Sequence, residues 1–125
     1  MRAENAAAVA QLDALGVPTF AIGAVPPKQT GSYAVVGTDS GTPNNYLLAG
    51  VHGARTYRVT VQCNGDTYNE AAWVAEKADA AFLDRPLAGV TDQNGQREIT
   101  PSIVRDPDGG GHMYALATYT FLKEQ

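Results

Sequence analysis

Apolar and polar positions alternate most clearly along residues 57–63, whose odd-numbered positions are Tyr, Val, Val and Cys. This period of two predicts a β-strand with one buried face. Residues 113–122 alternate in the same way, but both of their faces carry apolar side chains. The pattern therefore predicts a last strand that is covered on both faces, one of them by a neighbouring molecule.

Two segments have helical spacing instead. Residues 2–15 are rich in Ala, with apolar residues three or four positions apart, and Gly16 followed by Pro18 ends that helix. A second helix is expected to end near residue 83, with Thr67 or Asn69 as the residue that caps its first turn. Its apolar stripe consists mainly of Ala, which allows close packing on a sheet.

Shorter segments complete the predicted fold. Residues 19–22 and 33–38 are expected to be extended, whereas residues 38–45, rich in Gly, Ser, Thr and Asn, predict a long loop. Residues 97–104 and 113–122 are expected to form a hairpin. The element order predicts one α+β domain over residues 1–125, with two helices packed on a mainly antiparallel sheet of four to five strands.

The composition argues against several classes of binding site. The 125 residues carry 9 Lys and Arg against 13 Asp and Glu, a formal charge of −4, so the cationic surface that grips nucleic-acid phosphates is not expected. One Cys excludes an intrachain disulfide, and one Cys with two His makes a closed zinc site improbable. Residues 1–15 match neither a signal peptide nor a membrane span, which predicts synthesis in the cytoplasm and no membrane partner.

One short motif points to catalysis. Asp39, Ser40 and Gly41 follow a hydrophobic segment, as in the D-[ST]-G triplet of retroviral-type aspartic proteases, whose dimers share one proton between two such carboxylates. The next residues lack the small apolar continuation of those enzymes, and two helices do not fit their fold. We therefore interpret the triplet as turn residues that bond the local backbone.

The other candidates are weaker. Cys63 with His52 would make a thiolate pair, but Cys63 lies on an apolar strand face, which indicates an inert core residue. Both histidines are expected at the surface. Trp73 is expected in the core or at its edge. Glu98 and Asp106 could be a pair of carboxylates for acid–base catalysis, but no neighbouring feature predicts a cleft around them. No catalytic residue, cofactor or metal site is predicted.

The order of elements nevertheless resembles a known family, the tail-terminator or head-to-tail joining proteins of long-tailed phages that infect actinobacteria. The resemblance spans nearly the whole chain and rests on element order, because the family has no diagnostic motif. Six segments carry it: residues 15–19, 31–36, 57–63, 69–74, 83–87 and 114–121.

This resemblance implies a structural virion protein without catalysis. Such subunits form a ring, expected to be hexameric, that caps the tail tube, stops its growth and joins it to the head-tail connector protein. The expected location is the tail-neck region of the virion, after assembly in the host cytoplasm. An acidic ring would also let DNA pass through its lumen without specific binding, because like charges repel.

Two loops are the expected contact surfaces of the ring. One lies within residues 38–55 and the other is the predicted hairpin tip at residues 106–112; solvated, mobile loops are the alternative for both. The interface candidates are Asn44, Asn45, Tyr46, His52, Arg55, Asp106, Asp108 and His112.

Other functions stay open at this point. A head-closure or tail-tube protein would share the virion location and ring symmetry of a terminator. A dimeric aspartic protease would use Asp39, and a monomeric small-molecule binding module would need an apolar pocket that the pattern does not indicate.

Overall fold

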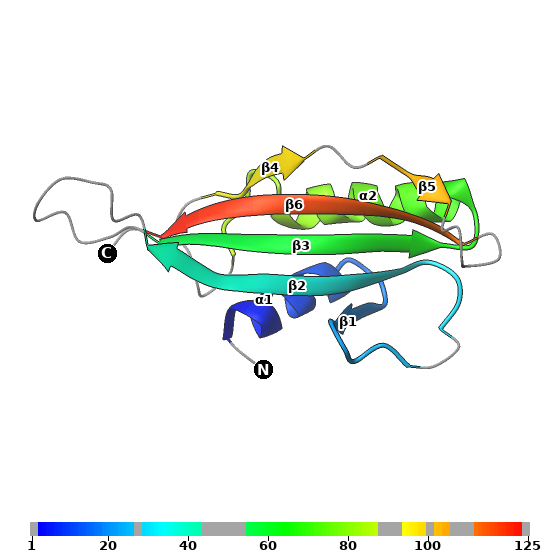
Figure 1. The fold of residues 1–125 in the computed structure, drawn as a ribbon, viewed down its shortest axis with the longest axis horizontal. Helices are drawn as coiled ribbons and strands as arrows, with labels where there is room; N and C mark the ends of the chain where they lie inside the picture. Colours follow the sequence, from blue (N-terminus) through cyan, green and yellow to red (C-terminus); the bar gives the residue numbers. More distant parts are fainter. Residues whose placement is uncertain are drawn as a thin grey trace, which may run out of the picture.

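The computed structural model describes residues 3–26, 29–43, 55–87, 94–99, 102–105 and 112–123. Within these residues, six strands form one sheet and two helices lie together on one side of it (Figure 1). In chain order the elements are α1 (Ala3–Asp13), β1 (Thr19–Ala21), β2 (Tyr33–Pro43), β3 (Arg55–Gly65), α2 (Tyr68–Phe82), β4 (Gln96–Ile99), β5 (Val104–Arg105) and β6 (Met113–Lys123).

The three eleven-residue strands β2, β3 and β6 form the centre of the sheet, which has the order β1-β2-β3-β6-β4, with β5 also paired to β6. Only β1 runs parallel to its neighbour; the other described pairs are antiparallel. The α+β class, the mainly antiparallel sheet and the two helices are thus confirmed, with helix bounds within two residues of the prediction.

The strand expected over residues 97–104 is wrong as a single element. It divides into β4 and β5, which pair with different parts of β6, and this division gives six strands instead of four or five. Two features explain the break. The register shifts between Arg97 and Ile99, and the sequence has a proline at position 101, which has no N–H to donate to a ladder.

The loop expected over residues 38–45 is also wrong in its first part, because β2 continues to Pro43. This extension pairs with the beginning of β3, and the register shifts between Asp39 and Thr42. A bulge there absorbs the turn-like Ser40 and Gly41 without ending the strand. Residues 44–54 lie outside the described residues.

One face of the sheet forms the core. Alternate positions of β2, β3 and β6 point to the helices, as the period of two predicted for residues 57–63, and their side chains are completely or almost completely buried. They are Ala34, Val36, Val59, Val61, Cys63, Ala115, Ala117, Tyr119 and Phe121. The ring of Phe82 from α2 packs on Tyr119 and Phe121 at centroid distances of 5.4 and 6.2 Å.

Helix α2 has the predicted cap at Thr67, whose hydroxyl accepts a hydrogen bond from the Glu70 N–H at 3.2 Å. Gly65 at the end of β3 brings the strand close to this first turn. A Cβ at position 65 would lie 2.6 Å from the backbone nitrogen of Ala71, so a larger residue would push the helix away.

A polar cluster joins the second half of α2 to the sheet. The carboxylate of Asp79 accepts a hydrogen bond from the Tyr119 hydroxyl at 2.6 Å and pairs with the Arg97 guanidinium at 2.6 Å. Tyr119 is fully buried, and burial together with this bond raises the pKa of its hydroxyl. One side chain of α2 therefore ties the helix to both β6 and β4.

Candidate functional site

The structure places Cys63 in the core, as expected. Its side chain is fully buried, and burial raises the pKa of the thiol to about 12, with the nearby Asp79 as a second cause. A thiol that stays protonated is a poor nucleophile. Its proposed partner His52 lies outside the described residues, so the geometry supports a core residue rather than a catalytic one.

The Asp39, Ser40 and Gly41 triplet lies in β2 rather than in a turn, which corrects the expected conformation. In the sheet register Asp39 is opposite Arg58 on β3. The triplet is thus part of a paired strand, whereas the protease motif follows one.

No group of three His, Cys, Asp or Glu side chains among the described residues is arranged to hold a metal ion. In the same part of the chain, neither helix has the length and apolar character needed to cross a membrane.

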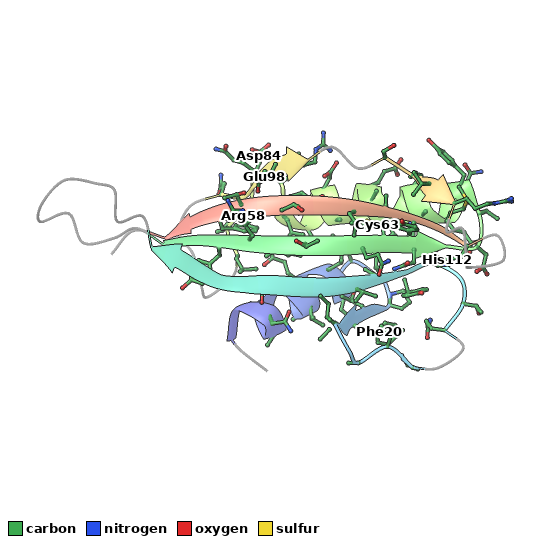
Figure 2. The ribbon with its side chains drawn as sticks, viewed as in Figure 1. Phe20, Arg58, Cys63, Asp84, Glu98 and His112 are labelled. Carbon is green, nitrogen blue, oxygen red and sulfur yellow. The ribbon has the colours of Figure 1, made fainter. Side chains whose placement is uncertain are left out.

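Most of the predicted interface residues lie outside the described residues: Asn44, Asn45, Tyr46, His52, Asp106 and Asp108. Arg55 is the first residue of β3 and is opposite Lys123 at the end of β6. His112 lies at the other end of the sheet, directly before β6 (Figure 2). The described backbone therefore separates Arg55 and His112 by the length of the central strands.

His112 is half-buried in a cluster rather than fully at the surface. Its Nε2 donates to Oδ1 of Asn64 at 2.8 Å, while the Asn64 amide donates to the carbonyl of Gln62 at 3.0 Å. Asn64 is buried, and the His112 ring is 6.1 Å from the ring of Tyr33. Burial and the charge of Asp66 raise the pKa of Tyr33.

This cluster continues into an apolar surface on the sheet face opposite the helices. The ring of Phe20 meets Tyr33 edge-on at 6.3 Å, and Ile22 covers the bare backbone of Gly37. Ile22, Leu116 and Val104 are 71%, 50% and 43% exposed. We call these residues the apolar band: Phe20, Ile22, Tyr33, Val35, Val104, Tyr114 and Leu116. The outward positions of β3 that lie between its two parts, Gln62 and Asn64, are polar.

The other half of the same face is polar. Arg58 pairs with Glu98 at 3.1 Å, and the Thr120 hydroxyl donates to the same carboxylate at 3.0 Å. The Thr120 bond and then Arg58 lower the pKa of Glu98. Figure 2 shows Arg58 and Glu98 near one end of the sheet, and Phe20 and His112 toward the other.

The helix side carries a second apolar feature. A groove of about 540 Å³ lies between α1 and α2 and the residues that follow α2. We call it the helix groove; it is lined by Ala7, Ala10, Gln11, Leu15, Ala80, Ala81, Arg85 and Pro86. Trp73 of α2 is 37% exposed, and Nζ of Lys77 lies 5.8 Å from the centroid of its ring.

Sequence reasoning missed the apolar band as a unit. Its one signal was the apolar character of both faces of the last strand, which predicted a neighbour on the outer face. Ile22 and Val104 could not be added from the sequence, because Ile22 directly follows β1 at one edge of the sheet and Val104 lies on β5 at the other.

Comparison with known proteins gives a fold rather than a family. No family model and no curated protein sequence matches the chain. Among solved structures, the fold matches a chain of the "Virion of native gene transfer agent (GTA) particle", with a TM-score of 0.69 and 13% sequence identity. The match covers 97% of this chain and 94% of that chain, so the two share the fold over almost their entire lengths.

Proposed function

We propose that this chain is a structural virion protein that forms a ring on the end of a phage tail tube. In that role it stops tube growth and joins the tail to the head-tail connector. The observation that carries the proposal is the fold match to a virion chain over nearly the full length of both chains. The resemblance of the element order to tail terminators, found independently in the sequence, supports the same role.

The surface of the described residues agrees with a protein that acts by contact. The apolar band leaves large hydrophobic side chains exposed on one sheet face, and such patches mark interaction sites on soluble proteins. The two reactive groups that the sequence offered, Cys63 and Asp39, lie in the core and in a paired strand. The proposal therefore assigns binding of protein partners and no catalysis.

Light scattering tests the ring directly. A closed ring of six 13.2 kDa copies has a mass of about 79 kDa, six times that of the monomer. The mass is measured for the protein alone and after addition of the tail-tube protein encoded in the same genome. A discrete oligomer, together with tubes that stop lengthening in electron micrographs, supports the proposal.

Other outcomes identify the alternatives. Unlimited polymerisation of the chain alone indicates a tail-tube protein, and binding to the connector without an effect on tube length indicates a head-closure protein. A strict monomer that ignores both partners contradicts the proposal. An Asp39→Asn variant that assembles normally but loses a peptidase activity would establish the protease alternative.

A further inference from the structure

The sequence contains two Asn-Gly pairs, at residues 64–65 and 94–95. In such a pair the asparagine can lose its side-chain amide without an enzyme, because glycine has no Cβ that keeps its backbone nitrogen away from the preceding side chain. The two pairs have the same local sequence but lie in different surroundings in the fold. The structure therefore predicts a different reactivity for each of them.

The reaction consumes only water. The glycine nitrogen gives up its proton and forms a bond to Cγ of the asparagine, while the bond from Cγ to the side-chain nitrogen breaks and ammonia leaves with that proton. Water then adds to one of the two carbonyl carbons of the cyclic imide, and the bond from that carbon to the ring nitrogen breaks. Attack on the side-chain carbonyl gives aspartate, and attack on the backbone carbonyl gives isoaspartate.

The pair at residues 64–65 is held in the centre of the sheet. Asn64 is almost fully buried, its Oδ1 accepts a hydrogen bond from Nε2 of His112 at 2.8 Å, and its amide donates to the Gln62 carbonyl at 3.0 Å. At Asn64 the strand is paired with β2 on one side and with β6 on the other, and Gly65 is buried against the first turn of α2. The amide cannot turn toward the Gly65 nitrogen until these contacts open together, which amounts to global unfolding.

The pair at residues 94–95 lies at the edge of the sheet. Asn94 is exposed, and its side chain has no hydrogen bond within the part of the chain that the structure describes. Two bonds hold the backbone of Gly95: its N–H donates to the Arg85 carbonyl at 2.8 Å, and its carbonyl accepts from the Asp84 N–H at 2.9 Å. These bonds belong to isolated bridges rather than to a continuous ladder.

Few contacts therefore have to open before Asn94 can react. The adjoining strand β4 has only four residues, and its register shifts after Arg97. Local opening at such an edge costs less free energy than separation of the central strands. We propose that Asn94 is a site of spontaneous deamidation in the folded protein, whereas Asn64 reacts only after global unfolding. This inference does not depend on the proposed ring.

The modification has a structural consequence at Gly95. An added Cβ there would meet the ring of Phe121 and the end of α2, so the backbone has no free space at this position. Isoaspartate inserts an extra methylene into the backbone directly before Gly95 and has to displace it. Deamidation at Asn94 therefore loosens the contact of β4 with α2.

Peptide mapping by mass spectrometry tests the proposal on the full-length protein. The protein is incubated in mildly alkaline buffer made with heavy-oxygen water, which labels each asparagine that is hydrolysed, and in the same buffer with denaturing urea. The protection of each site is the ratio of its rate in urea to its rate in buffer. Protection of Asn94 should be at least about tenfold smaller than that of Asn64, which corresponds to a difference in opening free energy of at least about 1.4 kcal/mol.

Low urea concentrations, below the unfolding transition, provide a second measurement. The rate at Asn64 should rise with urea as global unfolding does, while the rate at Asn94 should change little, because a local opening exposes little surface. Asn94→Gln is the matched control. It keeps an amide but lengthens the side chain, so the label should disappear from this peptide, which also contains Gln93 and Gln96.

Two results would overturn the proposal. Equal protection of the two sites, including no detectable reaction at either in buffer, means that the edge is as closed as the centre of the sheet. A rate at Asn94 that rises with urea in parallel with that at Asn64 means that both react from the globally unfolded chain. Label that persists in the Asn94→Gln peptide places the reaction at another residue and also contradicts the assignment.

Discussion

Replacement of Asp79 by alanine is expected to destabilise the fold more than any other change at a partly exposed position of α2. The Asp79 carboxylate is the acceptor of the Tyr119 hydroxyl, which is fully buried, and the partner of Arg97. In Asp79→Ala the hydroxyl keeps its place in the core but has no acceptor.

The magnitude follows from three contributions. A buried hydroxyl without a partner costs about 1 to 3 kcal/mol. Loss of the pair with Arg97, whose side chains are both 31% exposed, adds no more than about 1 kcal/mol. Alanine favours the helix over aspartate by about 0.6 kcal/mol, which offsets part of the loss. We expect Asp79→Ala to lower the free energy of unfolding by about 1 to 3 kcal/mol.

Urea denaturation followed by circular dichroism measures this change as a lower midpoint with an unchanged slope. Tyr119→Phe is the matched control, because it removes the hydroxyl and leaves the carboxylate paired with Arg97. The double variant should lose less than the sum of the single variants by about 1 kcal/mol, since no group is then left unpaired. Additive losses, or a loss below about 0.5 kcal/mol in Asp79→Ala, would refute the role of this cluster.

Three further predictions address the core, the backbone and the polar half of the outer sheet face. Cys63 should react with a thiol reagent only as fast as the protein unfolds, and fast labelling of the folded protein would contradict its burial. Because the pKa of its thiol is raised, the contribution of Cys63 to stability is fully present below about pH 8.5 and declines as the pH rises toward 12. In thermal melts, Gly95→Ala should destabilise the fold by about 1 to 3 kcal/mol, because the new Cβ meets the backbone carbonyl of Phe82 at the end of α2. Gly37→Ala is the control and should destabilise it less, because its Cβ meets only the flexible, exposed side chain of Ile22. The lowered pKa of Glu98 means that its contribution to stability is present above about pH 4.3 and is lost as the pH falls through its folded value, so the wild type should lose more stability on acidification than Glu98→Gln. Equal acid sensitivity of the two proteins would contradict the contacts of Glu98 with Thr120 and Arg58.

The parts of the fold that the sequence predicted depend on local patterns. Alternation along residues 57–63 identified the buried face correctly, because a strand with one covered face must place its apolar side chains at every second position. The caps and breakers around Gly16 and Thr67 placed the helix ends within two residues. Such signals lie within a few residues of the structure that they determine.

The errors arose where distant partners decide the structure. Residues 38–43 are turn-like in composition, but pairing with β3 keeps them in a strand. The contact of Asp79 was not predicted, because nothing near it in the sequence indicates that Tyr119, forty positions away, donates a hydrogen bond to it. The apolar band combines residues from β1 to β6, so only the register of the whole sheet reveals it.

The two ends of the outer sheet face differ in chemistry. The end that carries Arg58 and Glu98 has the threonines and the ion pair typical of a solvated antiparallel face. At the other end Ile22, Leu116 and Val104 are 71%, 50% and 43% exposed. Among the described residues of this face, large exposed hydrophobic side chains therefore lie at one end only, and such side chains are typical of a contact surface. This asymmetry is what the proposed function requires, because a virion protein without catalysis acts through its contacts with other proteins.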